Sequence, residues 1–248
     1  MPIISRQLRP KKLIEYALRP FPSLYRFGSK FYHKAAGSFR PCSPGTPDGV
    51  SRALRLALEL NPDDVGDYYE FGVFRGYTFL SAQQCCDELQ ITDMRFYGFD
   101  SFKGFPKLEE VDQARNLFFE GQCAASKESV VKDLDERGFD WSRGHLIEGM
   151  FDESLTTELK SKFPFRRAGV ALLDCDLYSS TRDTLAWLVD YLADNSVLLF
   201  DDWFTYGRDP ELGQQRAFAE FLTVNPDLKA EPLWDFSDYG TAFLLHKA

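Results

Sequence analysis

The stretch Val170-Ala-Leu-Leu-Asp-Cys-Asp-Leu-Tyr178 decides how this chain of 248 residues folds. Its apolar residues are followed directly by two carboxylates, Asp174 and Asp176. A short, uninterrupted aliphatic run is typical of a strand that is buried on both faces of a parallel sheet. Residues two apart on an extended chain point to the same side, so we expect Asp174 and Asp176 to share one face, with Cys175 on the other.

A second apolar run, Val197-Leu-Leu-Phe200, ends in the pair Asp201-Asp202. If the two strands are neighbours, all four carboxylates gather at the carboxyl edge of the sheet, where open α/β folds bind their ligands. Such a cluster stays fully ionised only beside a cation. Because hard oxygen ligands favour magnesium, manganese or calcium over zinc, the sequence predicts a divalent-metal site on an α/β enzyme.

Strand-like and helix-like segments alternate along the chain, which predicts an α/β fold with a doubly wound, mostly parallel seven-stranded sheet. The expected strands are Tyr68–Val73, Arg95–Phe99, His145–Glu148, Val170–Asp174, Val197–Asp201, Glu231–Asp235 and Thr241–His246. The expected helices are one from Val50 that stops at Asn61-Pro62, then Thr78–Leu89, Lys127–Arg137, Asp152–Lys162, Ser180–Leu192 and Glu211–Leu222. The last two strands are close in sequence and fit an antiparallel hairpin.

Residues 1–47 differ from the rest of the chain, since they hold seven of its 13 prolines amid aromatic and basic residues. We interpret them as an N-terminal arm or lid, and residues 48–248 as one domain. The chain has a net charge of −9, and residues 1–40 carry about +8, which leaves −17 on the remainder. An acidic body disfavours nucleic acid as a partner. We expect the arm to lie against that acidic body or a neighbouring subunit, with an anionic membrane surface as the alternative.

Composition sets further limits. Apolar residues make up 44% of the chain, with 23 Phe and 11 Tyr, which predicts an aromatic-rich core. The longest apolar runs are shorter than the roughly 20 residues of a transmembrane helix, and the basic N-terminus lacks the apolar run of a secretory signal. The five cysteines form no C-x-x-C pair, which fits a cytoplasmic location and neither a disulfide framework nor a zinc site.

A glycine-bearing turn follows the first expected strand, in Glu70-Phe-Gly-Val-Phe-Arg-Gly76. Glycine there lets a ligand approach the backbone closely. The segment lacks the dinucleotide fingerprint, because Phe74 occupies the position of its second glycine and would obstruct a pyrophosphate. An acidic turn without a phosphate cradle fits S-adenosylmethionine. Asp100, at the end of the second expected strand, is placed to accept hydrogen bonds from a ribose diol.

Five segments occur in a characteristic order: Glu70–Gly76, Gly98-Phe-Asp-Ser-Phe-Lys-Gly-Phe-Pro106, Glu148-Gly-Met-Phe151, Asp174-Cys-Asp-Leu-Tyr-Ser-Ser-Thr181 and Phe200-Asp-Asp-Trp203. From about residue 46 to the C-terminus, this combination resembles the macrocin O-methyltransferase family. The resemblance implies a class I, Rossmann-like methyltransferase domain at 48–248 that uses S-adenosylmethionine and a divalent metal, methylates sugar hydroxyls of natural products, and forms a homodimer or higher homo-oligomer. Cys175 departs from the glycine that is common in this D-x-D motif, and the turn at Phe74–Tyr77 is bulkier than usual.

The resemblance also implies roles for individual residues. Magnesium, or manganese or calcium in its place, would be held by Asp174, Asp201 and Asp202, with Asp176 as the general base. Glu70 and Gly72 would hold the methionine end of the cofactor and Asp100 its ribose, while Ser126 and Glu148–Phe151 would lie near the adenine. The full set of expected cofactor contacts is Glu70, Gly72, Val73, Phe74, Gly76, Asp100, Ser101, Ser126, Gly149, Met150, Phe151 and Asp174.

A sugar hydroxyl is a poor acid, so an aspartate base needs a metal that lowers the pKa of that hydroxyl. A phenolic or catechol acceptor would use the same chemistry and is the second candidate. A D-x-D motif also marks metal-dependent glycosyltransferases, but that function leaves the glycine turn and Asp100 unexplained. A phosphatase of the haloacid dehalogenase type and a non-catalytic cofactor-binding module are weaker alternatives.

Overall fold

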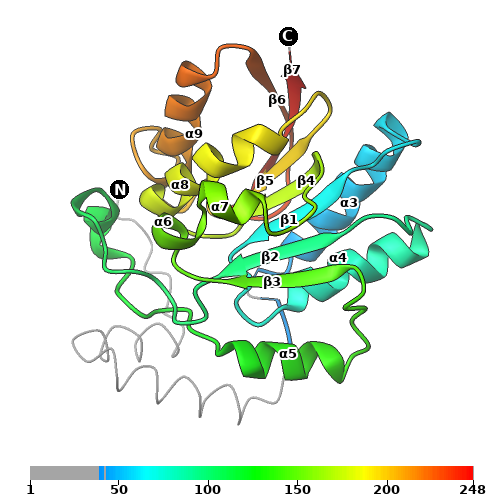
Figure 1. The fold of residues 1–248 in the computed structure, drawn as a ribbon. Coiled ribbons are helices and arrows are strands. Elements are labelled where there is room, and N and C mark those ends of the chain that lie inside the picture. Colours follow the sequence, from blue (N-terminus) through cyan, green and yellow to red (C-terminus); the bar gives the residue numbers. More distant parts are fainter. Residues whose placement is uncertain (1–38, 42, 248) are drawn as a thin grey trace.

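The computed structural model describes residues 39–41 and 43–247. Seven strands form one sheet in the order β3-β2-β1-β4-β5-β7-β6 (Figure 1). Only β7 runs antiparallel to its neighbours β5 and β6; the other pairs are parallel. The strands are β1 (Asp67–Phe71), β2 (Phe96–Asp100), β3 (Gly144–Glu148), β4 (Ala168–Leu173), β5 (Val197–Phe200), β6 (Leu228–Asp235) and β7 (Thr241–Lys247). The predicted mostly parallel sheet and its C-terminal hairpin are therefore confirmed.

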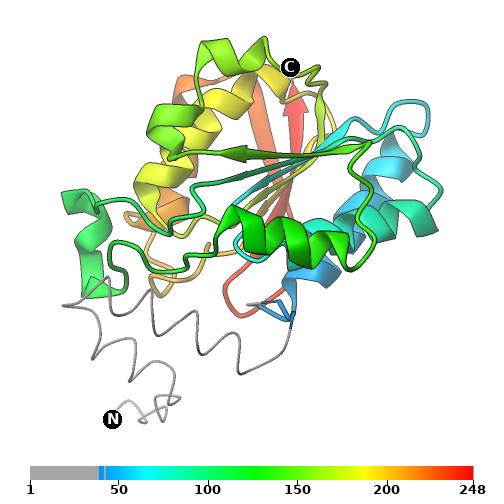
Figure 2. The same cartoon turned by 60° about the horizontal axis from the view of Figure 1, so that its bottom comes forward.

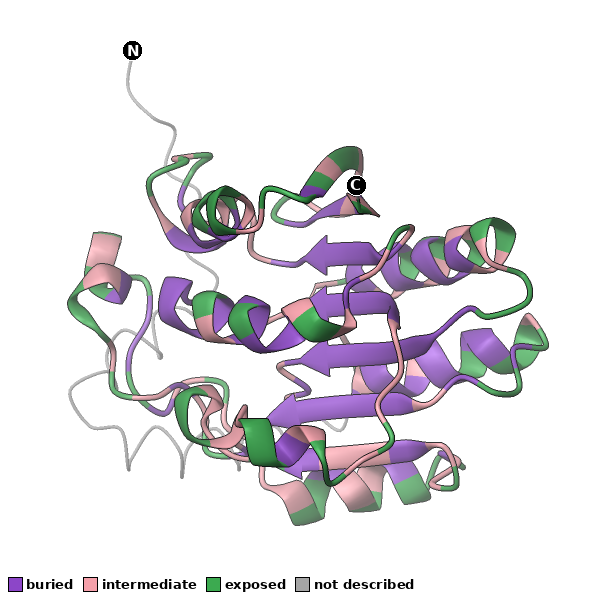
Figure 3. Cartoon of the chain, turned by 45° about the horizontal axis from the view of Figure 1, so that its top comes forward, coloured by how far each residue is buried: buried purple, intermediate pink, exposed green. Residues whose placement is uncertain are grey.

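Helices cover both faces of this sheet (Figures 1 and 2). One face packs against α3 (Thr46–Leu60), α4 (Tyr77–Glu88) and α5 (Lys127–Asp135). The other packs against α6 (Phe151–Ser154), α7 (Thr157–Lys160), α8 (Tyr178–Leu188) and α9 (Gly213–Val224). Side chains alternate along each strand, so Tyr68 belongs to the first layer and Tyr69 to the second, and both are fully buried. Figure 3 shows the central strands as continuously buried.

Element boundaries differ from the predictions where local hydrogen bonds intervene. The helix expected over Asp152–Lys162 is two short helices, because Thr156 interrupts it and its Oγ1 accepts a bond from the N–H of Leu159 at 3.2 Å. The segment after α8 tightens into a 3₁₀ turn, η2 (Val189–Tyr191). α3 begins at Thr46, inside the expected arm, while residues 1–38 of that arm lie outside the described part of the chain.

None of the helices within the described ranges is both long and apolar enough to cross a bilayer.

The carboxyl ends of β1 and β4 approach each other very closely at Gly72. A Cβ on this glycine would lie 1.8 Å from the carbonyl oxygen of Asp174, and its φ of +100° is left-handed. The N–H of Asp174 in turn donates to the carbonyl of Phe71 at 2.9 Å. The glycine turn and the first aspartate of the D-x-D motif are therefore held against each other by backbone contacts.

Gly72→Ala should lower the free energy of unfolding by about 2–5 kcal/mol, because the methyl group both clashes with backbone and disfavours the positive φ. Gly138→Ala is the matched control, since Gly138 also has a positive φ (+76°) but an added Cβ there meets nothing within 4 Å. The control should lose only about 1–2 kcal/mol. If urea denaturation gives the same loss of unfolding free energy for both variants, the close approach at Gly72 is contradicted.

Candidate active site

A pocket of about 310 Å³ opens at the carboxyl ends of β1, β2, β4 and β5. Among the described residues its lining is strongly acidic, with nine carboxylates against three cationic side chains: Glu70, Asp100, Glu109, Asp152, Asp174, Asp176, Asp183, Asp201 and Asp202 against Arg40, Arg75 and Lys107. Such a lining favours ligands that carry positive charge.

Glu70, the last polar residue of β1, lies at the bottom of this pocket and is 1% exposed. Its Oε2 accepts a hydrogen bond of 2.6 Å from the hydroxyl of Tyr68. Burial raises the pKa of Glu70 to about 8, although the hydrogen bond from Tyr68 opposes the shift. A positively charged group bound beside Glu70 would stabilise its carboxylate.

The carboxylate of Asp100 joins the two loops that follow β1 and β2. Its Oδ2 accepts from the N–H of Phe74 at 2.7 Å, and its Oδ1 accepts from the N–H of Phe102 at 2.6 Å. Burial raises the pKa of Asp100, and these backbone hydrogen bonds lower it. Phe74 has a φ of +48°, so the position of the missing second glycine is left-handed even though phenylalanine occupies it. Asp100 thus shapes the cofactor turn and still borders the pocket.

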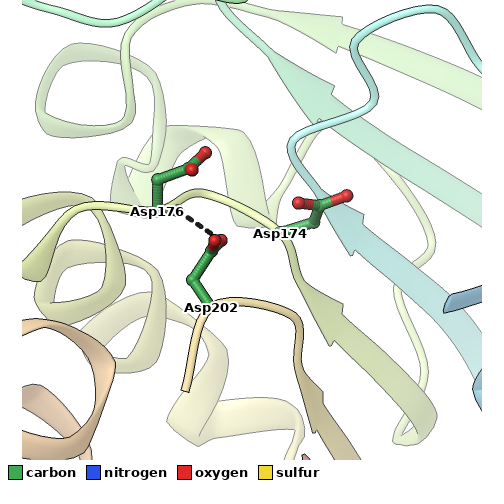
Figure 4. Close-up of side chains that lie close together, drawn as sticks. All are labelled: Asp174, Asp176 and Asp202. Carbon is green, nitrogen blue, oxygen red and sulfur yellow. Dashed lines mark hydrogen bonds between the residues drawn. The ribbon is translucent and has the colours of Figure 1, made fainter. Parts of the chain in front are cut away.

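Three aspartates converge at the ends of β4 and β5 (Figure 4). One carboxylate oxygen from each of Asp174, Asp176 and Asp202 lies within 4.8 Å of the others. The N–H of Asp176 donates to Oδ2 of Asp202 at 3.1 Å. The other oxygen of Asp202 accepts from the hydroxyl of Thr205 at 3.1 Å, so this side chain is oriented from two sides.

Asp201 belongs to the same acidic floor but has its own anchor. Its Oδ1 accepts from the hydroxyl of Thr46, the first residue of α3, at 2.5 Å. The amide N–H of the next residue, Asp202, donates to Oε1 of Gln214 at 3.0 Å, which fixes the direction of the chain after β5. Both residues of the Asp201-Asp202 pair are therefore held by hydrogen bonds to helices on opposite faces of the sheet.

We expected Asp174 and Asp176 to converge because they lie two residues apart on an extended strand. They converge instead because the chain turns between them. β4 ends at Leu173, and the next residues form a tight turn in which the N–H of Leu177 donates to the carbonyl of Cys175 at 2.5 Å. Asp176 adopts a left-handed φ of +58°, and its backbone N–H faces the carboxylate of Asp202 (Figure 4). Cys175 is buried in the opposite layer, as expected, within 3.5 Å of the hydroxyl of Thr181.

The donor set at this floor fits a hard divalent cation. Burial raises the pKa of Asp176, and the negative charge of Asp202 is the next largest cause. The same two causes raise the pKa of Asp201 to about 7. Burial likewise raises the pKa of Asp202 to about 6. Carboxylates concentrated in this way resist ionisation together, and a bound cation removes that resistance. Oxygen ligands alone favour magnesium, manganese or calcium.

Most of the expected site residues border this one pocket. They are Glu70, Gly72, Val73, Phe74, Asp100, Ser101, Gly149, Met150, Phe151, Asp174, Asp176, Asp201 and Asp202. The structure does not bring Gly76 and Ser126 into the lining. Gly76 is the left-handed N-cap residue of α4, and Ser126 caps α5 by accepting from the N–H of Ser129 at 3.4 Å. Their expected cofactor contacts stay predictions.

The pocket also has a wall that the sequence analysis did not assign. It comes from the connection between β2 and α5, through Gly104, Phe105, Pro106, Lys107, Glu109 and Cys123. The Phe-Lys-Gly-Phe-Pro run was a visible signal for part of this wall. Asp112, buried in the same connection, gave no signal, because it lies in an irregular segment without periodicity.

Glu70→Gln should weaken the pH dependence of stability in the ligand-free protein. Because the pKa of Glu70 is raised on folding, the folded state retains a proton that the unfolded state loses, and stability falls as pH rises from about 4.5 to about 8. Glu70→Gln should remove a fall on the order of 4 kcal/mol over that window. Glu59→Gln, an exposed change on α3, is the control. Identical pH profiles of urea stability for wild type and Glu70→Gln would contradict this assignment.

Comparison with known proteins identifies the family. The family model described as Macrocin-O-methyltransferase matches residues 52–224. Mycinamicin III 3''-O-methyltransferase of Micromonospora griseorubida is 26% identical over 145 residues, 56% of this chain and 55% of that protein. A tetracenomycin-C rhamnosyl 4'-O-methyltransferase of Streptomyces olivaceus is 29% identical over 143 residues, 56% of this chain and 53% of that protein. The chain thus spans about half the length of these curated relatives.

Solved structures share the fold. The O-methyltransferase NovP superposes with a TM-score of 0.69 at 20% identity, over 83% of this chain and 81% of that chain. The calicheamicin methyltransferase CalS11 superposes with a TM-score of 0.65 at 22% identity, over 80% of this chain and 77% of that chain. With the family model covering the segment from α3 to the end of α9, and the fold shared with these structures, the chain belongs to the macrocin O-methyltransferase family.

Proposed function

We propose that this protein transfers the methyl group of S-adenosylmethionine to a hydroxyl of a sugar or glycosylated natural product, with the help of a divalent cation. The observation that carries the proposal is the acidic pocket at the carboxyl ends of β1, β2, β4 and β5. Its buried carboxylates favour both a sulfonium donor and a metal ion. Family membership supports the reaction type, and the name of the tetracenomycin relative specifies a substrate that carries a rhamnosyl group.

The donor would occupy the part of the pocket beside β1 and β2. Glu70 and the turn at Gly72–Phe74 are available for the ammonium and carboxylate of its methionine portion. Asp100 has both oxygens engaged by backbone N–H groups, but each oxygen retains a lone pair for a ribose hydroxyl. Gly149, Met150 and Phe151 border the far side and would contact the adenine.

The acidic floor beside β4 and β5 would bind the metal and receive the proton. Asp174 and Asp202 are metal ligands in this proposal, with Asp201 as the third, and Asp176 is the general base. A divalent cation bound there supplies a Lewis acid that lowers the pKa of the acceptor hydroxyl. As the new O–C bond forms and the sulfonium C–S bond breaks, Asp176 accepts the hydroxyl proton. Its left-handed backbone and its contact with Asp202 hold the carboxylate toward the floor.

A phenolic or catechol acceptor is compatible with the same floor and is the second candidate class. We place the enzyme in the cytoplasm, which is supported by the free thiols of Cys85, Cys86 and Cys175. The homodimer or higher homo-oligomer, and the packing of the N-terminal arm, stay predictions.

Removal of single carboxylates should separate metal ligands from the base. Asp202→Asn and Asp201→Asn should each weaken Mn²⁺ binding by about tenfold or more in calorimetry with bound S-adenosylhomocysteine, whereas Asp176→Asn should change it by about twofold or less. Asp183→Asn, a pocket carboxylate paired with Arg182, controls for loss of charge. If Asp176→Asn weakens Mn²⁺ binding and Asp201→Asn does not, Asp176 is a metal ligand in place of Asp201. Absence of Mn²⁺ binding in wild type, with full turnover in EDTA, would end the metal proposal.

Asp176→Asn should lower kcat by about 10²–10⁴-fold while leaving the affinity for S-adenosylhomocysteine unchanged, since the base acts only on the acceptor. The assay is methyl transfer to a panel of methyl rhamnoside, methyl glucoside, methyl mannoside and catechol, with UDP-glucose hydrolysis as the test of a glycosyltransferase. Turnover of catechol alone would select the phenolic class. Binding of UDP-glucose without S-adenosylhomocysteine binding would reject methyl transfer.

A further inference from the structure

Helix α8 begins directly after the D-x-D turn and lacks a cap of its own. Its N-cap residue is Leu177, which has no side-chain oxygen and makes no capping bond. The first N–H groups of a helix have no partner within that helix. This helix start follows Asp176 by two residues, so whatever holds the helix start also restrains the proposed base.

Asp112 provides the missing cap from a distant part of the chain. It belongs to the 3₁₀ segment η1 (Glu110–Asn116) in the connection between β2 and α5, and it is 0% exposed. Its Oδ1 accepts from the N–H of Ser179 at 3.2 Å, and its Oδ2 accepts from the hydroxyl of Ser179 at 2.5 Å. A carboxylate at a helix N-terminus also interacts favourably with the helix dipole.

A small apolar cluster reinforces the same junction. Leu177 is fully buried among Phe105, Phe118 and Tyr206. Phe105 and Phe118 come from the connection that carries Asp112, and Phe118 contacts both Phe105 and Tyr206 edge-on, at ring-centroid distances of 5.4 and 6.2 Å. Figure 1 shows this green connection, with η1, projecting from the body of the fold toward the end of the sheet where α8 begins, and η1 contacts α8.

The backbone of Asp176 needs restraint of this kind. A left-handed φ is uncommon for a residue other than glycine, and aspartate adopts it at a modest cost when its surroundings hold it there. β4 fixes the chain before the turn, the N–H of Asp176 donates to Asp202 within it, and contacts at Leu177 and Ser179 fix the chain directly afterwards. The contact at Ser179 and part of the packing on Leu177 come from the connection that also supplies the pocket wall through Phe105, Pro106, Lys107 and Glu109.

We propose that Asp112 is a positioning residue that couples the pocket wall to the orientation of Asp176. When the wall is docked, Asp112 and the cluster around Leu177 hold the turn in the conformation that directs Asp176 to the acidic floor. When the wall detaches, the start of α8 loses its cap and Asp176 loses the restraint on the chain that follows it. The predicted effect of this coupling on catalysis rests on the proposed function, in which Asp176 is the base.

The coupling between Asp112 and the start of α8 can be measured without an acceptor. Asp112→Asn and Asp112→Ala should increase amide exchange of the Leu177–Thr181 peptide at least about tenfold, because the N–H of Ser179 loses its charged partner. Glu110→Gln, which removes a carboxylate from the exposed start of the same segment, should leave this exchange unchanged. Unchanged protection in both Asp112 variants would overturn the coupling. If Asp112→Ala does not fold, Asp112→Asn and Ser179→Ala provide the same comparison.

The predicted effect on catalysis is tested by a double-mutant cycle on kcat, with the methyl glycoside that the wild type methylates fastest. Asp112→Asn should lower kcat roughly 10- to 100-fold, with S-adenosylhomocysteine affinity and acceptor KM within about twofold. In the Asp176→Asn background it should have little further effect, because its action runs through that base. An equal loss in both backgrounds would show a general structural role instead. Wild-type kcat in Asp176→Asn would reject the proposed base, irrespective of the exchange result.

Discussion

The dominant physical constraint on this protein is the concentration of carboxylates at one edge of its sheet. Asp174, Asp176 and Asp202 approach within 4.8 Å, and Asp201 and Glu70 are buried nearby. Burial raises the pKa of each of Asp176, Asp201, Asp202 and Glu70, so ionising them together is unfavourable without a cation. Hydrogen bonds stabilise three of these carboxylates, since Glu70 accepts from Tyr68, Asp201 from Thr46, and Asp202 from Thr205 and the N–H of Asp176. The pocket also leaves room for positively charged ligands.

Sheet order explains why the proposed donor site and the proposed metal floor are adjacent. β1 lies between β2 and β4, so the glycine turn after β1 lies between Asp100 on one side and Asp174 on the other. At Gly72 the two chain ends touch through backbone atoms, which leaves no space for a side chain. A methyl donor held by the turn and a hydroxyl held over the floor would therefore meet without a large movement of either strand.

The connection between β2 and α5 adds a second level of organisation. It borders the pocket, and it also caps α8 through Asp112 and buries Leu177. The contacts that hold the wall in place are thus also the contacts that hold the start of α8, next to the proposed base. In the proposed coupling, these contacts connect the position of the wall to the geometry of the proposed base.

The sequence by itself determined the order of strands and helices along the chain, the antiparallel hairpin, and many of the residues that gather at the pocket, because each depends on local pattern. Apolar runs that end in aspartate, and a glycine turn after the first strand, are visible within a few residues. Only the tertiary structure decided the left-handed turn at Asp176, the anchor of Asp201 on Thr46 and the cap that Asp112 places on α8. Those last two contacts join residues 155 and 67 positions apart, and pairing over such distances leaves no periodic signal in the chain.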